Sequence, residues 1–449
     1  MATTFSEAIS RAPLRRFSIV TFAICMLVLI CDGMDAQLLG IVAPRVIEDF
    51  GVDRSTFGIA MSAALVGFGI GAWSGGWLGD TIGRRYSLAL ASALFALATI
   101  GAAWAGDVWQ MAAWRLIGGI GFGGAYANAI ALASEWLPDR WRSVAVTTLS
   151  VGTPAGGTVV GWIAPGLVET YGWEGTFIAL GAATLLVVVL ILALLRDSPS
   201  FLLARGKPAE ARRAAARVLE GEVDLVAERH GAAKDGETAI GVLHRANARL
   251  NLGIGISFAA SAMCAYGILN WSTTFLTSKG FTLAQAGGAV SIGGLTSIGA
   301  SILAGLLVYR FGSKAVMTTI AVLLMALMAG FGFTVEQLPA APTESERLLV
   351  VVLLGATAAV FSAGIASMYA IMTYGYPPSC RSAGIGFGIF MSRVGAIAAS
   401  GFGGTLLEWG GDSVVPFFAV LTVSAALVLA APLLIDRQVP PARMRAAVA

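Results

Sequence analysis

Long uninterrupted apolar stretches recur along this 449-residue chain and constrain its fold more than any other feature. A helix needs about 20 apolar residues to cross about 30 Å of hydrocarbon. Backbone polar groups in hydrocarbon must pair within helices or closed barrels. Reading these stretches in order, we predict twelve transmembrane helices, at residues 17–40, 55–78, 86–105, 109–134, 144–169, 174–195, 252–277, 283–308, 315–334, 347–373, 383–408 and 413–435.

The composition excludes a soluble protein. Charged residues make up 12% of the chain and hydrophobic residues 57%, whereas about 25% of the residues of a soluble domain are charged. Arg11, Arg15 and Arg16 precede an apolar run from Phe17 and resemble the start of a signal peptide. No small-residue cleavage site closes that run, so we interpret it as the first span.

The positions of Lys and Arg predict the orientation, because cytoplasmic loops retain positive charge. With the N-terminus inside, 23 of the 29 basic residues face the cytoplasm and four lie outside. The other two, Arg115 and Arg393, lie within predicted spans. Both termini are therefore expected to be cytoplasmic, in a multi-pass protein of a bacterial inner membrane. This bias explains the net charge of +3 without a nucleic-acid partner.

A polar segment rich in Ala, Arg and Glu divides the chain into three parts. We predict an N-terminal six-helix half at 1–195, a cytoplasmic central loop at 196–250 made of amphipathic helix and linker, and a C-terminal six-helix half at 251–449. The fold class is thus all-α, with two pseudo-symmetric halves, as in many transporters built from repeats.

The two halves repeat each other at two pairs of loops. Residues 76–85, after the second span, share their glycine spacing with residues 305–314, after the eighth. Residues 135–142 and 374–381 follow the fourth and tenth spans with a matching proline and arginine. In each pair the second copy lacks the acidic residue of the first.

These motifs carry a family resemblance. The run Gly76-x3-Asp80-x2-Gly83-Arg84-Arg85 resembles the loop signature of the major facilitator superfamily, and Arg115-x3-Gly119-x-Gly121-x-Gly123 resembles its fourth-span motif. The chain is more closely similar to the aromatic acid/proton symporter (metabolite/proton symporter) family. That similarity rests on Asp32-Gly33-Met34-Asp35, Ser134-Glu135 with Pro138 and Arg142, Asp197 to Leu202, Tyr266 to Trp271, and Arg381 with Arg393. It implies a twelve-helix fold and proton-driven transport of aromatic acids.

Two aspartates in the first span are candidates for carrying the proton. An ionisable group in hydrocarbon costs at least about 2.5–3.5 kcal/mol and marks function. Asp32 and Asp35 are three residues apart, on one face of the helix, and the predicted spans contain no histidine. We predict that they take up and release the coupling proton. Alternatively, they pair with Arg115 and fix the first span to the fourth.

Arg393 is the candidate anchor for an anionic substrate. It lies about ten residues into the eleventh span, near the midplane where transporter substrates bind. A guanidinium holds a carboxylate through two parallel hydrogen bonds; the alternative is a bond to backbone carbonyls. Further polar side chains at this depth could bind the substrate or only pack: Tyr126, Asn128, Tyr266, Asn270 and Tyr369.

Charged residues near the cytoplasmic ends of the spans are candidates for gating. A tight glycine turn brings the second and third spans together, and its charges could lock the halves as access alternates. The alternative is a solvated loop. The candidate gating residues are Gly76, Asp80, Gly83, Arg84 and Arg85 in the turn, Glu135 and Arg142 after the fourth span, and Arg381 after the tenth.

The sequence therefore predicts a secondary transporter that couples proton entry to uptake of a small organic acid, such as a hydroxybenzoate. Other substrates in the same fold (an aliphatic carboxylate, a sugar, or a drug exchanged for protons) and a membrane sensor remain alternatives. No enzyme is expected, because no nucleophile and base converge in the spans. The cysteines and histidines lack metal-ligand spacing, so we expect no metal or cofactor beyond the proton gradient, and a monomer.

Overall fold

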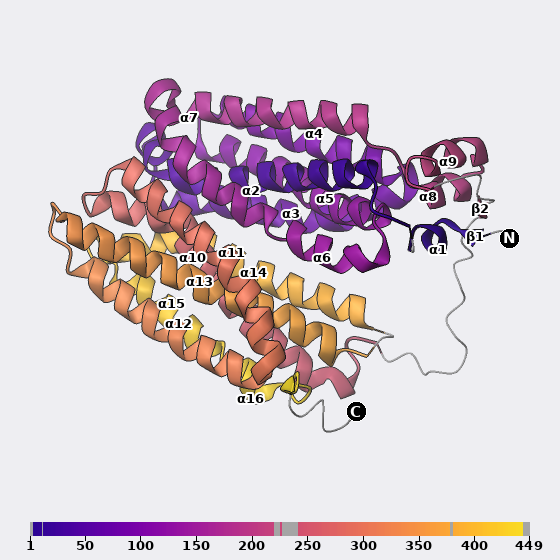
Figure 1. The fold of residues 1–449 in the computed structure, drawn as a ribbon. Coiled ribbons are helices and arrows are strands. Elements are labelled where there is room, and N and C mark those ends of the chain that lie inside the picture. Colours follow the sequence, from indigo (N-terminus) through magenta and orange to yellow (C-terminus); the bar gives the residue numbers. More distant parts are fainter. Residues whose placement is uncertain (1–2, 11, 220–224, 227–240, 378–379, 443–449) are drawn as a thin grey trace.

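The helices form two groups that lie side by side (Figure 1). This computed structural model describes residues 3–10, 12–219, 225–226, 241–377 and 380–442; part of the predicted central loop, with His230, lies outside them. The elements of the first group and the segment after it are β1 (Thr3–Thr4), α1 (Phe5–Ser10), α2 (Arg16–Phe50), α3 (Arg54–Ile82), α4 (Arg84–Ala102), α5 (Val108–Glu135), α6 (Asp139–Leu149), α7 (Gly152–Leu194), α8 (Pro199–Ala204), α9 (Pro208–Ala215) and β2 (Leu225–Val226). The second group comprises η1 (Arg245–Asn247), α10 (Ala248–Ser278), α11 (Leu283–Phe311), α12 (Ser313–Glu336), α13 (Glu344–Gly375), α14 (Arg381–Gly410), α15 (Val415–Leu427) and α16 (Ala430–Leu434).

Twelve membrane spans follow from eleven long helical segments. Within the described residues, eleven helical segments are long and apolar enough to cross a membrane. One of them, α7, has 43 residues and breaks at Gly172, where φ is 72° and ψ is 176°. This left-handed φ suits glycine, and the break divides α7 into the predicted fifth and sixth spans. The all-α fold with six spans in each half is confirmed.

Two predicted span boundaries were wrong. The fifth span was predicted at 144–169, but a separate helix, α6, ends at Leu149 and α7 starts only at Gly152. The first span was predicted to end at residue 40, whereas α2 continues through Pro44 to Phe50. Gly51 then ends the helix with a left-handed φ of 59°, as is common at helix C-termini.

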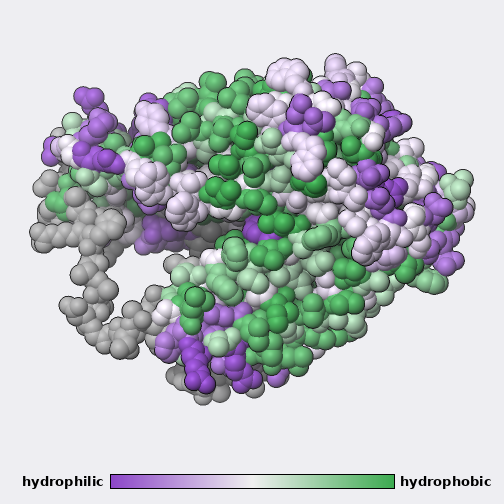
Figure 2. Space-filling model, turned by 180° about the vertical axis from the view of Figure 1, so that it is seen from behind, coloured by the Kyte–Doolittle hydropathy of each residue, from purple (hydrophilic) through white to green (hydrophobic). Residues whose placement is uncertain are grey.

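Apolar side chains cover the outside of both groups, where lipid would lie. Figure 2 shows hydrophobic residues spread over the flanks of the molecule and hydrophilic residues gathered toward its ends. Leu186 on α7, Leu306 on α11 and Phe333 on α12 are exposed. In water such a surface would be unfavourable, but hydrocarbon accommodates it.

Within each half the helices approach closely at small residues. A Cβ on Gly71 of α3 would lie 2.0 Å from the Ile120 carbonyl oxygen of α5. One on Gly33 of α2 would lie 1.9 Å from the Thr153 carbonyl oxygen of α7. Such approaches are typical of membrane helices, and they bring polar side chains of different spans into reach of one another.

The segment after α7 contains two short helices, α8 and α9. Pro199 starts α8, whose N-terminus is capped by the Ser198 hydroxyl. In α9, Ala211 and Ala214 are buried while Arg213 is exposed. These helices lie at the end of the first half that also carries α1 (Figure 1).

Candidate functional site

Arg393 on α14 is the centre of a polar cluster between the two halves. Its Nη1 donates to the Tyr266 hydroxyl of α10 at 2.8 Å, and its Cζ lies 3.9 Å from the centroid of the Phe68 ring of α3. Its Nε is buried and has no hydrogen-bond partner among the described residues. A cation over an aromatic face is stabilised by the ring quadrupole, so Phe68 and Tyr266 hold the guanidinium and leave Nε free to donate.

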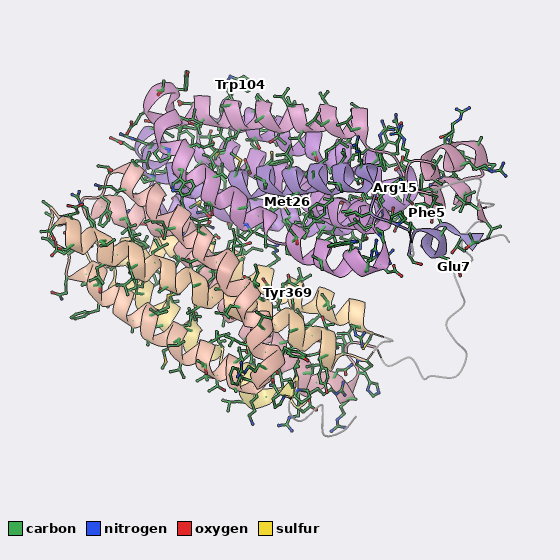
Figure 3. The ribbon with its side chains drawn as sticks, viewed as in Figure 1. Phe5, Glu7, Arg15, Met26, Trp104 and Tyr369 are labelled. Carbon is green, nitrogen blue, oxygen red and sulfur yellow. The ribbon has the colours of Figure 1, made fainter. Side chains whose placement is uncertain are left out.

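Three tyrosines from different helices lie within electrostatic range of this guanidinium. Tyr126 of α5, Tyr266 and Tyr369 of α13 all interact electrostatically with Arg393. Figure 3 labels Tyr369 on the side of α13 that faces the first half; its side chain is 41% exposed and its ring packs edge-on against Phe258 at 5.5 Å. The cluster therefore offers aromatic faces and hydroxyl groups around one cation.

The two aspartates of α2 have different partners. Asp35 accepts hydrogen bonds from Arg115 Nη1 at 2.5 Å and from the Thr99 hydroxyl at 2.9 Å. Asp32 accepts a 3.3 Å bond from Thr153 through Oδ2, and its buried Oδ1 has no partner among the described residues. Asp32 is also within electrostatic range of Arg393. Asp35 therefore connects α2 to α4 and α5, whereas Asp32 belongs to the Arg393 cluster.

The two asparagines predicted beside the tyrosines make packing contacts instead. Asn128 is fully buried, and its amide donates to the carbonyl oxygens of Gly75 and Gly124 and to the Ser87 hydroxyl at 2.8–2.9 Å. Asn270 donates to the Ser400 hydroxyl of α14 at 2.7 Å. None of these four bonds reaches the Arg393 cluster. We therefore assign Asn128 to packing of α3, α4 and α5, and Asn270 to packing of α10 on α14.

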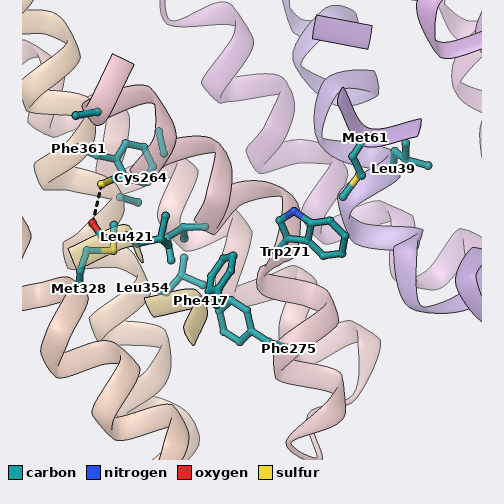
Figure 4. Close-up of a cluster of buried hydrophobic side chains, with 14 of the residues drawn as sticks. Leu39, Met61, Cys264, Trp271, Phe275, Met328, Leu354, Phe361, Phe417 and Leu421 are labelled. Atoms are coloured by element: carbon teal, nitrogen blue, oxygen red, sulfur yellow. Dashed lines mark hydrogen bonds between the residues drawn. The ribbon is translucent and has the colours of Figure 1, made fainter. Parts of the chain in front are cut away.

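At the end away from the termini, the halves are in contact. The Ser55 amide donates to Glu408 at 3.2 Å, and the Ser291 hydroxyl of α11 donates to the Thr158 carbonyl of α7 at 2.8 Å. Figure 4 shows Trp271 of α10 pointing toward α2 and α3. At the opposite end, Figure 2 shows a hollow between the halves. The structure is therefore closed at the far end and open on the side of the termini.

The turn between α3 and α4 is held by charges of the first half. Arg84 bonds Asp80 at 2.5 Å and approaches Glu135 at 3.5 Å. The Arg85 amide donates to Asp197 at 2.9 Å. Burial raises the pKa of the Asp197 carboxyl above its ordinary value, although the Arg85 amide opposes this. The turn is thus fixed to the end of α5 and to the segment after α7.

The remaining gating candidates lie further from this turn. Arg142 pairs with Asp139 at 2.9 Å and donates to the Ser134 carbonyl at 3.1 Å. Arg381, at the start of α14, is half-buried and its Nε has no partner among the described residues. Gly76 lies on α3 with open space where a Cβ would be. The ion pairs of Arg84 and Arg142 join residues of the first half to one another.

Four contributors to the site were not predicted. Phe68 under the guanidinium, Thr153 on Asp32, Thr99 on Asp35 and Asp197 under the α3–α4 turn come from four different parts of the chain. Phe68 and the threonines are ordinary residues in apolar spans, so no sequence signal distinguishes them. Asp197 had a signal, since it begins the Asp-Ser-Pro motif after the sixth span.

Comparison with known proteins agrees with this architecture. The sequence model of the Major Facilitator Superfamily matches residues 25–343. The chain is 29% identical to the 4-hydroxybenzoate transporter PcaK of Acinetobacter baylyi, over 94% of this chain and 92% of that protein. It is 29% identical to a gallate transporter of Pseudomonas putida, over 90% and 88%. The inward-open structure of the xylose transporter XylE from E. coli has a TM-score of 0.71 at 18% identity, covering 94% of this chain and 97% of that one.

Proposed function

Since the chain belongs to the Major Facilitator Superfamily and is therefore a multi-pass membrane transporter, we propose that it takes up a small aromatic carboxylic acid together with a proton. The relatives named as transporters of 4-hydroxybenzoate and gallate support the substrate class. The observation that carries the proposal is the Arg393 guanidinium, whose Nε has no partner among the described residues, between three tyrosines and Phe68.

Arg393 binds the carboxylate of the substrate. Its Nη1 is used by Tyr266 and its face by Phe68, so the edge with Nε remains for the acid. A charge-assisted hydrogen bond of this kind is about twice as strong as a neutral one. The cation stays charged at every pH at which cells live, so substrate binding does not depend on its own protonation.

The aromatic ring of the substrate lies among the tyrosines. Tyr126, Tyr266 and Tyr369 offer ring edges and faces for offset contact and hydroxyls for a ring substituent of the acid. Tyr369 is the most accessible of the three. A hydroxyl on the ring of the substrate can pair with one of these tyrosine hydroxyls, so that neither group is left buried without a partner. The pocket therefore favours hydroxylated benzoates over aliphatic acids.

Asp32 carries the proton, and Asp35 fixes the helix that presents it. Asp32 has an oxygen without a partner among the described residues, near Arg393, so its charge and the substrate carboxylate compete for the same cation. Protonation of Asp32 frees Arg393 for the acid, which couples the two cargoes. The ion pair of Asp35 with Arg115 holds α2 against α5 while Asp32 and the substrate carboxylate exchange places at Arg393. This ion pair breaks only if the proton passes from Asp32 to Asp35.

Access alternates by movement of residues 1–195 relative to residues 251–449. The termini and the 196–250 segment are cytoplasmic, as the positive-residue bias indicates. Asp80, Arg84, Arg85 and Glu135 form a latch on the cytoplasmic side, with Arg381 as its counterpart in the second half. The latch closes when the hollow closes.

The test is uptake of labelled 4-hydroxybenzoate into proteoliposomes, with and without an inside-alkaline pH gradient. Wild type accumulates the acid only with the gradient. Asp32→Asn loses gradient-driven accumulation but still exchanges external for internal substrate, since exchange needs no net proton movement. Arg393→Ala loses both activities. Asp412→Asn, a matched change in an exposed loop, behaves as wild type.

Two results would contradict the proposal. If uptake equals that of empty liposomes for every aromatic acid tested, the assignment of the substrate class is wrong, whereas the assignment of the fold is unaffected. Accumulation that is insensitive to the gradient removes the proton coupling and leaves the substrate site intact.

A further inference from the structure

A basic pocket lies outside the transport site, at the end of the first half that carries α8 and α9. It has a volume of about 740 Å³ and is formed by the α3–α4 turn, the end of α7 and the two short helices. Six cations and two carboxylates line it: Arg85, Arg196, Arg205, Lys207, Arg213 and Arg217 with Asp197 and Glu210. Nothing in the proposed transport cycle uses most of these residues.

The two carboxylates of the pocket leave most of its positive charge uncompensated. Glu210 pairs with the neighbouring Lys207 at 3.2 Å, and Asp197 accepts from the Arg85 backbone amide at 2.9 Å. The buried Nε of Arg85 has no partner among the described residues. Cations gathered in a concave site raise the local concentration of anions, so the pocket suits a negatively charged ligand.

Two of the six cations, Arg205 and Arg217, are anchored so that they remain in the pocket. The Arg205 guanidinium donates to the Thr81 carbonyl at the end of α3 and lies 5.5 Å from the Phe201 ring centroid. The Arg217 guanidinium lies 5.2 Å from the Phe17 ring centroid of α2. These contacts leave donors available while holding the side chains together, which lowers the entropic cost of binding.

The pocket adjoins the lipid-facing surface. Tyr86 lines it and is half exposed on α4, near the exposed Leu90 one helical turn away. On α7, which packs against α4, Leu192 and Leu194 are exposed, and the Leu192 carbonyl accepts from the Arg85 guanidinium. A ligand in the pocket would therefore have exposed apolar protein surface beside it.

We propose that this pocket binds the phosphate-bearing headgroup of an anionic phospholipid, with the acyl chains lying along α4 and the end of α7. The bound headgroup bridges the α3–α4 turn to α8 and α9. Basic pockets beside membrane helices select anionic lipids at about 1 kcal/mol for each Lys or Arg near the surface. This inference is independent of the transported substrate and of the proton.

The test is lipid binding by the purified, delipidated full-length protein. Native mass spectrometry detects the bound lipid, and the unfolding temperature reports the stabilisation that it gives. Phosphatidylglycerol binds and raises the unfolding temperature, whereas phosphatidylcholine does not. The double variant Arg196→Gln/Arg213→Gln weakens phosphatidylglycerol binding by about ten- to thirtyfold. The matched control Arg310→Gln/Lys314→Gln removes two cations at the same end of the second half and leaves binding unchanged.

Three outcomes would overturn the proposal. Equal loss of binding in the pocket and control variants would mean that the lipid recognises general surface charge. Displacement of the lipid by millimolar inorganic phosphate, with phosphate alone raising the unfolding temperature as much, would mean that the ligand is a free anion. Unchanged binding in a pocket variant whose lipid-free unfolding temperature matches wild type would mean that the pocket is not the site.

Discussion

At the residue scale, Arg393 uses the face and the edge of its guanidinium for different contacts, to Phe68 and to Tyr266. A lysine would keep the charge but lose the planar fork. We expect Arg393→Lys to raise the KM for an aromatic acid at least about tenfold, since a hydrogen bond to a charged group contributes about 1.5–3 kcal/mol. Uptake measured against substrate concentration checks this, with Arg310→Lys as the control. An unchanged KM would show that charge alone suffices.

The ion pair on α2 allows a second test at this scale. Asp35→Asn leaves the buried Arg115 guanidinium without its carboxylate, and breaking a buried pair costs about 3–5 kcal/mol. We expect a clear fall in unfolding temperature for Asp35→Asn and a partial recovery in the double variant with Arg115→Gln. Asp32 forms no ion pair within the described residues, so Asp32→Asn should leave the unfolding temperature near that of wild type.

The sequence predicted the residues of the Arg393 cluster only as far as their depth in the predicted spans determines which of them lie together. Polar residues deep in apolar spans indicated Asp32, Arg393 and the tyrosines, and the structure brings these together. Asn128 has the same depth as Tyr126, but two residues turn a helix by about 200°, so its side chain points toward α3 and α4. The sequence therefore predicts how deep a side chain lies in the membrane more reliably than it predicts which neighbouring helices the side chain faces.

At the element scale, the α3–α4 turn depends on Gly83, which has a φ of 100°. A Cβ there would lie 2.5 Å from the Asp197 carboxylate, so both the backbone and the neighbouring contact oppose a side chain. We expect Gly83→Ala to lower both the unfolding temperature and uptake. Gly76→Ala is the matched control, since nothing lies within 4 Å of its Cβ. Equal tolerance of both changes would show that the turn can relax.

The ends of the elements were less predictable than their existence. Hydropathy found every span because each must cross the same hydrocarbon thickness. It merged residues 144–149 with the fifth span, since those residues lack charge, although they belong to α6. It also ended the first span too early, because α2 continues beyond the apolar stretch through residues such as Arg45 and Glu48.

At the scale of the whole molecule, sequence could not predict which side of the transporter is open. The same helices serve both states of alternating access, and the states differ by a few kcal/mol. The contacts of Ser55 with Glu408 and of Ser291 with Thr158 close the end away from the termini. The first bond joins a backbone amide to the Glu408 carboxylate at the end of α14, and the second joins a serine hydroxyl to a backbone carbonyl. Nothing in the sequence pairs these groups with each other, so it carries no signal for the closed end.

The open side is testable by the accessibility of Tyr369, which is exposed beside Arg393. We expect Tyr369→Cys to react with a membrane-impermeant maleimide from the side of the termini and to be protected by an aromatic acid. Of the native cysteines, Cys25, Cys264 and Cys380 are buried, whereas Cys31 is half-buried next to Asp32 and is replaced by serine for this test. Asp412→Cys, in the loop after α14 at the opposite end, reports labelling from the other side. Reaction of Tyr369→Cys from that other side would mean that the resting protein is open in the reverse direction, and that the contacts at Glu408 are broken in the membrane.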